Sequence, residues 1–280
     1  MFDIFKYTIP LDDWIAMGVN WLVGNFRPQF QAIKVPIEIM LNSIDDLLLW
    51  LPSELILLAF LAIGWKTAGW KVGIFSCASM AFIGFMGLWD LTMTTLAMVI
   101  SAVVVDVLIG IPLGILSSRS DRFESYLRPI LDAMQTTPAF VYLVPVVMLF
   151  SIGTVAGVIA TIIFSMPPII RLTNLGIRQV HPELIEATYA FGATKRQVLW
   201  KVQIPLALTT IMAGLNQTIM LSLSMVVIAS LIGAGGLGVP VFEGLNSLQV
   251  GLAGIGGLGI VLMAMVLDRI TQSLGSDKKS

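Results

Sequence analysis

The sequence predicts an all-α integral membrane protein with about seven transmembrane helices. Of its 280 residues, 57% are hydrophobic and only 12% are charged, whereas a soluble domain carries roughly 25% charged residues. The apolar residues also form long blocks, and a membrane-spanning helix needs about 20 mostly apolar residues to cross about 30 Å of hydrocarbon. A water-soluble globular fold is therefore excluded.

Composition also argues against several other classes of protein. The formal net charge is −1, and no basic run with interleaved aromatic residues is present, so nucleic acid is not an expected partner. Cys77 is the only cysteine and His181 the only histidine, so no intrachain disulfide, metal site or Ser/His/Asp arrangement can be assembled convincingly. Asp3, Asp12 and Asp13 interrupt the N-terminal apolar residues, which argues against a cleaved signal peptide.

Residues 1–50 are expected to form an amphipathic tail rather than a span. Because proline suits the first turn of a helix, Pro36 marks the expected helix start. Such a helix either lies along the extracytoplasmic membrane surface or packs against the rest of the protein, and the sequence leaves both open. The apolar residues at helical spacing after Pro36 are Ile37, Met40, Leu41, Ile44, Leu48 and Leu51.

Seven apolar segments after the tail are the expected spans. They lie near residues 52–65, 70–89, 91–116, 129–150, 153–171, 206–233 and 249–267. The first is the weakest, because about 14 residues at 1.5 Å each fall short of the hydrocarbon thickness. The expected organisation is two accessory helices over 51–90, a five-helix core over 91–268, and a C-terminal tail over 269–280.

Lysine and arginine predict the orientation. With seven spans, all but three of the 16 basic residues fall on one side, and the exceptions are Lys6, Arg27 and Lys34. Since loops rich in Lys and Arg face the cytoplasm, the N-terminus is expected outside and the C-terminus inside. Six spans would place the charges of the two halves of the chain in conflict.

The longest polar stretch of the C-terminal half, residues 174–205, falls on the cytoplasmic side of this topology. A short helix is expected over 182–190, because Pro182 suits a first turn. Gly192 is expected to break it, and a second short helix over 195–201 is expected to end before a proline.

This stretch resembles the cytoplasmic signature of the permease family of bacterial binding-protein-dependent ABC importers. That signature reads E-A-A, three residues, G, nine residues, then I-x-L-P. The sequence has Thr for the second alanine, Val for the first isoleucine and Ile for leucine, all small or aliphatic replacements. The residues assigned to the loop that couples the permease to its ATPase are Glu186, Ala187, Thr188, Tyr189, Phe191, Gly192, Ile204 and Pro205.

The resemblance implies a five-helix type I importer core and several partners. These are a second copy of the chain, two ATP-binding subunits, an extracytoplasmic substrate-binding protein and membrane lipid. ATP and Mg are expected only on the ATPase subunits, because this chain has no G-x-x-x-x-G-K-[ST] phosphate loop. The chain itself is expected to be a transport subunit without a cofactor, not an enzyme.

A narrower resemblance, to the glycine betaine/proline betaine branch, rests on residues 131–142, 166–171, 221–229 and 267–272. It implies a quaternary-ammonium substrate. The alternatives are the same architecture carrying choline, carnitine or another compatible solute, an ion-driven secondary transporter, and a membrane enzyme, for which a polar catalytic cluster is missing.

Prolines are expected to bend or interrupt several of the helices, at Pro138, Pro145, Pro167 and Pro168. Broken helices at membrane depth are tolerated only against protein or a water-filled path. The segment expected to line or gate the pathway is therefore Gln135, Thr136, Thr137, Pro138, Phe140 and Tyr142. The rings of Phe140, Tyr142 and Phe164 either offer cation–π faces to a trimethylammonium group or simply pack.

Residues 233–238 fit the dinucleotide fingerprint G-x-G-x-x-G, which needs a preceding strand and a following helix. An apolar span precedes the motif and Pro240 follows it, so dinucleotide binding is rejected. Similar turns close the outer end of the corresponding span in the permease family, which makes Gly235 and Gly236 candidates for an outer gate. Asp106 lies deep in a span, where an acid is functional, held by an internal hydrogen bond, or protonated.

Overall fold

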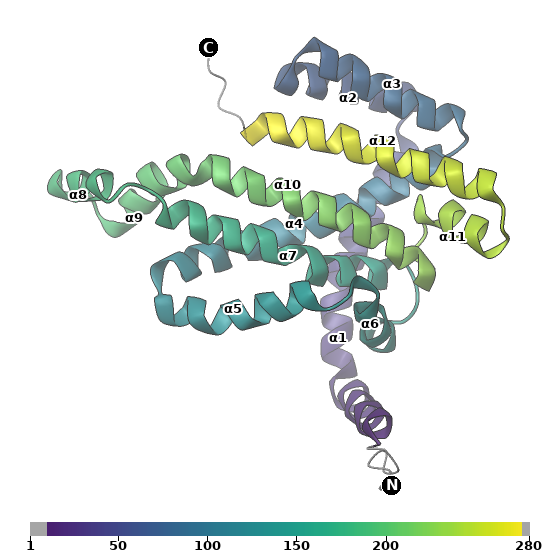
Figure 1. Ribbon diagram of the computed structural model, residues 1–280, viewed down its shortest axis with the longest axis horizontal. Coiled ribbons are helices and arrows are strands. Elements are labelled where there is room, and N and C mark those ends of the chain that lie inside the picture. Colours follow the sequence, from purple (N-terminus) through teal and green to yellow (C-terminus); the bar gives the residue numbers. More distant parts are fainter. Residues whose placement is uncertain (1–9, 276–280) are drawn as a thin grey trace, which may run out of the picture.

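The computed structural model describes residues 10–275, which are helical with short connections and contain no β-strand. Long helices lie side by side along the horizontal axis of Figure 1. Four helical stretches of the described chain are long and apolar enough to cross a membrane, and up to six are if each of two bent helix pairs counts as one span. The four include α4 (Trp89–Arg119), α7 (Thr154–Arg178), α10 (Ile204–Ala229) and α12 (Val250–Gly275).

Helix α7 is the centre of the bundle, packed between α4 and α10. Small residues allow the close approach, since a Cβ on Gly114 of α4 would lie 2.5 Å from the Cβ of Thr173, and one on Gly214 of α10 would lie 3.0 Å from the Cβ of Leu172. In a membrane, where lipid tails are as apolar as leucine, such van der Waals contact drives helix association. The largest buried cluster extends from α4 to α10 and α12 and includes Met93 and Val226.

The N-terminal region corrects two expectations. Helix α1 (Leu11–Trp50) does not begin at Pro36 but runs through it, and it crosses the bundle at a steep angle while contacting α4, α6 and α7. The predicted spans 52–65 and 70–89 are α2 (Ser53–Ala68) and α3 (Trp70–Phe85), 16 residues each. At 1.5 Å per residue each is about 24 Å long, less than the hydrocarbon thickness.

The predicted span 129–150 is two helices rather than one. Helix α5 (Asp121–Thr136) and helix α6 (Leu143–Phe150) are joined by a short 3₁₀ turn, η2 (Ala139–Tyr142), and the two parts are bent by 105°. The break coincides with Pro138, which cannot donate a backbone hydrogen bond and holds the preceding Thr137 in an extended conformation with ψ of 126°. The other prolines do not interrupt their helices, since α6 contains Pro145 and α7 contains Pro167 and Pro168.

The remaining elements are α8 (Pro182–Ala190), α9 (Lys195–Val198), a π-helical segment η3 (Leu199–Gln203), η4 (Ser230–Ile232) and α11 (Gly238–Asn246). The expected end of a second short helix before Pro205 is wrong, because α9, η3 and α10 continue from one to the next. Proline is tolerated there because it occupies the first turn of α10. Helix α12 also extends to Gly275 rather than ending at 268, and residues 276–280 lie outside the described residues.

Candidate functional site

The α8–α9 turn projects beyond the ends of α7 and α10 at one end of the bundle (Figure 1). Gly192 makes the turn with φ of +82°, a left-handed conformation that glycine adopts without a Cβ penalty. The turn is closed by backbone hydrogen bonds from Gly192 to Tyr189 and from Ala193 to Thr188. Thr194 then starts α9 with a capping box completed by Gln197.

The structure brings part of the predicted coupling loop together around a groove. Residues of α8, the turn and the start of α10 line a hollow of about 510 Å³: Leu184, Ala187, Thr188, Phe191, Ala193, Lys201, Val202, Pro205 and Leu206. The Phe191 side chain is 92% exposed and Tyr189 is 45% exposed, which suits insertion into a partner surface. Glu186 is exposed outside the hollow, and Ile204 instead packs against the buried residues of α7 and α10.

The α5–α6 break exposes most of the predicted pathway segment. Gln135, Thr136 and Pro138 are exposed, and Phe140 is 61% exposed. The Tyr142 hydroxyl donates to the Met134 carbonyl at 2.7 Å, so it satisfies a helix-end acceptor and holds the two parts of the bend together.

Tyr142 was expected either to offer a cation–π face to a trimethylammonium group or to pack against other side chains. Its ring meets Phe164 of α7 edge to face with centroids 6.3 Å apart, which is the geometry of a packed aromatic pair. Thr137 donates both its backbone N–H and its hydroxyl to the Ala133 carbonyl. The break is therefore a hydrogen-bonded elbow.

The predicted outer-gate glycines lie in the turn between η4 and α11, and α11 lies at the end of the bundle opposite α8 (Figure 1). Gly235 and Gly236 have φ of +81° and +75°. The following Leu237 donates its backbone N–H to the Thr95 hydroxyl of α4 at 2.8 Å, so this turn is anchored to the core. It lies between helices, without the strand that dinucleotide binding requires.

Asp106 makes an internal hydrogen bond, which is one of the alternatives that the sequence leaves open. The side chain is fully buried in α4, and Ser165 of α7 donates its hydroxyl to it at 2.6 Å. The contact joins α4 to α7, the central helix of the bundle.

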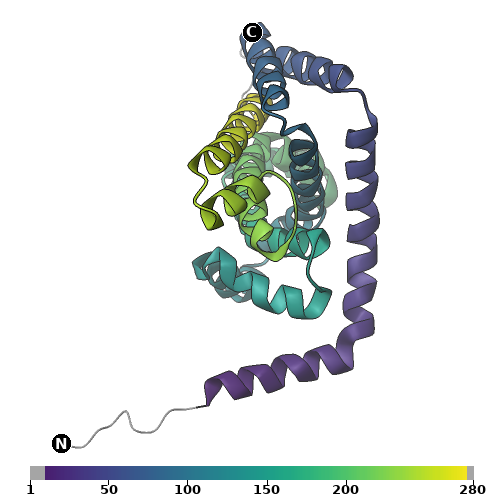
Figure 2. The same ribbon diagram turned by 90° about the vertical axis from the view of Figure 1, so that its right-hand side faces the viewer.

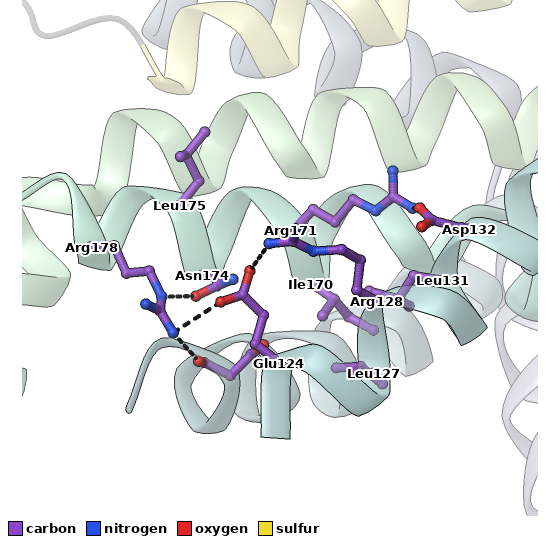
Figure 3. Close-up of a pocket in the computed structure, with 11 residues that line it drawn as sticks. Glu124, Leu127, Arg128, Leu131, Asp132, Ile170, Arg171, Asn174, Leu175 and Arg178 are labelled. Atoms are coloured by element: carbon purple, nitrogen blue, oxygen red, sulfur yellow. Dashed lines mark hydrogen bonds and ion pairs between the residues drawn. The ribbon is translucent and has the colours of Figure 1, made fainter. Parts of the chain in front are cut away.

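A charged cluster between α5 and α7 was not predicted. Arg178 donates to Asp121 at 2.6 Å, to Asn174 at 2.8 Å and to the Ser117 carbonyl at 2.8 Å, and it lies 3.0 Å from Glu124. Seven residues earlier on the same helix, Arg171 pairs with Asp132. A hollow of about 310 Å³ lies between the two helices, with Leu127, Leu131 and Ile170 on its apolar side (Figure 3).

The spacing of these charged residues along the sequence is the one signal from which the cluster could have been predicted. Residues seven apart lie on one helix face, as do residues three and eleven apart, so the two arginines of α7 and the acids of α5 at 121, 124 and 132 each form a stripe. Sequence alone does not say that the stripes face one another, because that depends on the antiparallel packing of α5 on α7.

Known proteins resemble this chain along almost its whole length. It is 54% identical to the glycine betaine/proline betaine transport system permease protein ProW of Escherichia coli over 98% of the chain and 78% of that protein. It is 45% identical to the glycine betaine transport system permease protein OpuAB of Bacillus subtilis, covering 97% of the chain and 96% of the relative. The glycine betaine/carnitine transport permease protein GbuB of Listeria monocytogenes is 43% identical, with 98% of both chains covered.

A solved structure with a similar fold and a matching family model agree with these sequence relatives. The structure of the MetNI methionine ABC transporter in inward-facing conformations superposes with a TM-score of 0.59 and 23% identity, covering 71% of this chain and 98% of that one. The model of the binding-protein-dependent transport system inner membrane component matches residues 107–276, within the helices that carry the elbow, the charged cluster and the α8–α9 turn. The chain belongs to the family of binding-protein-dependent transport system inner membrane components.

Proposed function

We propose that this chain is the permease of an ATP-driven importer for glycine betaine or a closely related quaternary-ammonium osmoprotectant. The proposed substrate is supported by sequence identity to known permeases. The chain is 43–54% identical, over 97–98% of its length, to three permeases whose names all include glycine betaine. The scarcity of buried charge is compatible with a zwitterionic cargo, because Asp106 is the one charged side chain among the fully buried residues described.

In this proposal two copies of the chain enclose the pathway, and each carries one ATPase subunit on its α8–α9 turn. The exposed Phe191 and the hollow beside it are the docking surface, and Gly192 permits the turn that presents them. ATP and Mg bind the ATPase subunits, whose closure moves the docked turns and tilts the attached helices. The extracytoplasmic binding protein delivers the cargo at the opposite end, near α11.

The α5–α6 elbow and the Gly235–Gly236 turn are the proposed pathway elements. The elbow supports this role because it interrupts an apolar segment and exposes polar and aromatic side chains at the interruption. A break in a helix at membrane depth is tolerated where it lines a water-filled path or is covered by protein. The glycine-rich turn is anchored to α4, so a shift of α4 relative to α10 would move it.

Uptake into proteoliposomes tests the proposal. The chain is reconstituted with its ATPase subunit and binding protein so that the ATPase faces the vesicle lumen. Uptake of labelled glycine betaine is then measured with and without ATP inside the vesicles. The expected result is uptake that needs ATP and the binding protein and is unaffected by ionophores. Uptake that survives ATP removal and collapses with an ionophore would instead establish a secondary transporter.

Competition in the same vesicles resolves the substrate. Unlabelled choline and carnitine are added at increasing concentrations against labelled glycine betaine. Weak competition by both supports a betaine importer, whereas loss of half or more of the labelled uptake at equal concentration of either identifies that solute as an equal or better cargo.

A further inference from the structure

The charged cluster adds ion pairs to a small apolar contact between α5 and α7, in which Leu131 packs with Ile169 and Ile170. Helix α5 has a single buried residue, Leu131, and its main contacts outside its own bent pair are with α4 and α7. Apolar packing of α5 against the cluster that contains the α7 isoleucines is limited to Leu131 and the partly buried Leu127 and Met134. The ion pairs are distributed along its length, with Asp121 and Glu124 near one end and Asp132 near the other.

Arg178 is the residue at which this link meets the α8–α9 turn. It is the last residue of α7, and α8 begins at Pro182. Its guanidinium donates at once to α5, to Asn174 of its own helix and to the C-terminal carbonyls of α4 through Ser117. Multidentate, charge-assisted contacts of this kind fix orientation as well as distance. A displacement of α8 is thus applied to three helices through one side chain.

The other end of α5 is the elbow. The second pair, Arg171 with Asp132, lies one turn before α5 ends at Thr136, and Tyr142 ties that end to η2. We infer that Arg178 and Arg171 are positioning residues that make α5 move with α7, so that motion of the α8–α9 turn reaches the elbow. This inference rests on the proposed function, and Figure 3 shows both arginines with Glu124 and Asp132.

These pairs are suited to coupling rather than to stability. The paired arginine side chains are 34–39% exposed and Asp132 is 55% exposed, and ion pairs exposed to this extent add little to folding free energy. Their removal is therefore expected to leave the bundle assembled while loosening the attachment of α5 to α7.

Replacement of Arg178 is the first arm of the test. Uptake and ATP hydrolysis are measured on the same proteoliposomes, and their ratio is compared with that of the unmodified complex. Arg178→Gln is expected to lower glycine betaine uptake per ATP hydrolysed about tenfold while hydrolysis and the amount of assembled complex stay unchanged. The control is Arg122→Gln, because the Arg122 guanidinium is exposed on α5, the helix with which Arg178 pairs, and makes no ion pair among the described residues.

The second arm exchanges the charges of the one-to-one pair. We expect the single variants Arg171→Asp and Asp132→Arg each to lower glycine betaine uptake per ATP hydrolysed. The double variant is expected to recover this ratio to within about twofold of the unmodified complex. An unchanged ratio in Arg178→Gln, a loss of assembled complex, or a double variant no better than its parents would each overturn the inference. If the unmodified complex gives no ATP-driven uptake, the proposed function has failed instead.

Discussion

At the residue scale, glycines with positive φ serve two different purposes in this chain. At Gly192 an added Cβ would meet open space, so only the backbone conformation, with φ of +82°, requires glycine. At Gly236, with φ of +75°, the Cβ would also lie 2.5 Å from the Thr95 hydroxyl. Substitution at Gly192 therefore isolates the effect of the turn, whereas substitution at Gly236 also disturbs packing against α4.

Replacement of Gly192 tests the turn. Gly192→Val is expected to abolish ATP-driven uptake, because a β-branched residue resists the left-handed conformation and the turn must rearrange, at a cost of about 1–2 kcal/mol. Gly192→Asn is the matched control, since asparagine tolerates this conformation. Uptake in vesicles with equal amounts of inserted protein is the measurement, and equal uptake by the two variants would contradict the role of the turn.

At the element scale, α2 and α3 form a hairpin that depends on two glycines facing one another. A Cβ on Gly64 would lie 2.9 Å from the Cα of Gly73, and a Cβ on Gly73 would lie 2.7 Å from the Leu61 carbonyl oxygen. Such contacts leave no space for a side chain, which is how small residues let membrane helices approach closely. The hairpin in turn packs against α12 and so completes one flank of the bundle.

Gly73→Ala is expected to lower thermal stability in detergent, because the methyl group must separate the two helices, at a cost of about 1–3 kcal/mol. The control is Gly84→Ala on the same helix, where the nearest atom to the new Cβ is 3.4 Å away. The fraction of protein that remains monodisperse after heating is measured. If both variants lose monodisperse protein at the same temperature, the close contact between α2 and α3 does not contribute to stability.

At the scale of the whole molecule, the two ends of the bundle differ in chemistry. The α8–α9 turn and the charged cluster of α5 and α7 gather toward one end, and the glycine-rich turn and α11 lie at the other (Figures 1 and 2). Since loops rich in Lys and Arg stay in the cytoplasm, we propose that the α8 end faces the cytoplasm.

Thiol labelling tests this orientation. In a Cys77→Ser background, Ser247→Cys beside α11 is expected to react with a membrane-impermeant maleimide applied to intact spheroplasts, whereas Thr194→Cys is expected to react only after lysis. Both positions are exposed, so access and not burial decides the outcome. Labelling of Thr194→Cys in intact spheroplasts would place the coupling turn outside and refute the proposed function.

Local chemistry predicted much of the loop and the elbow. The helix over 182–190, the turn at Gly192 and the break at Pro138 follow from backbone rules that act within a few residues, and the structure has all three. Pro36 and Pro205 misled the prediction because proline in a first turn and proline inside a longer helix look alike over a short window.

The sequence by itself determined the membrane class, the helical fold, the α8 turn and the α5–α6 break, because apolar length, glycine and proline act locally. Only the tertiary structure decided that Arg171 and Arg178 face the acids of α5, and that Ser165 meets Asp106. Those partners are 39 to 59 residues apart in the chain, and their meeting depends on which helix faces pack together. Helical spacing reveals a stripe of charge, but it does not reveal the helix across from it.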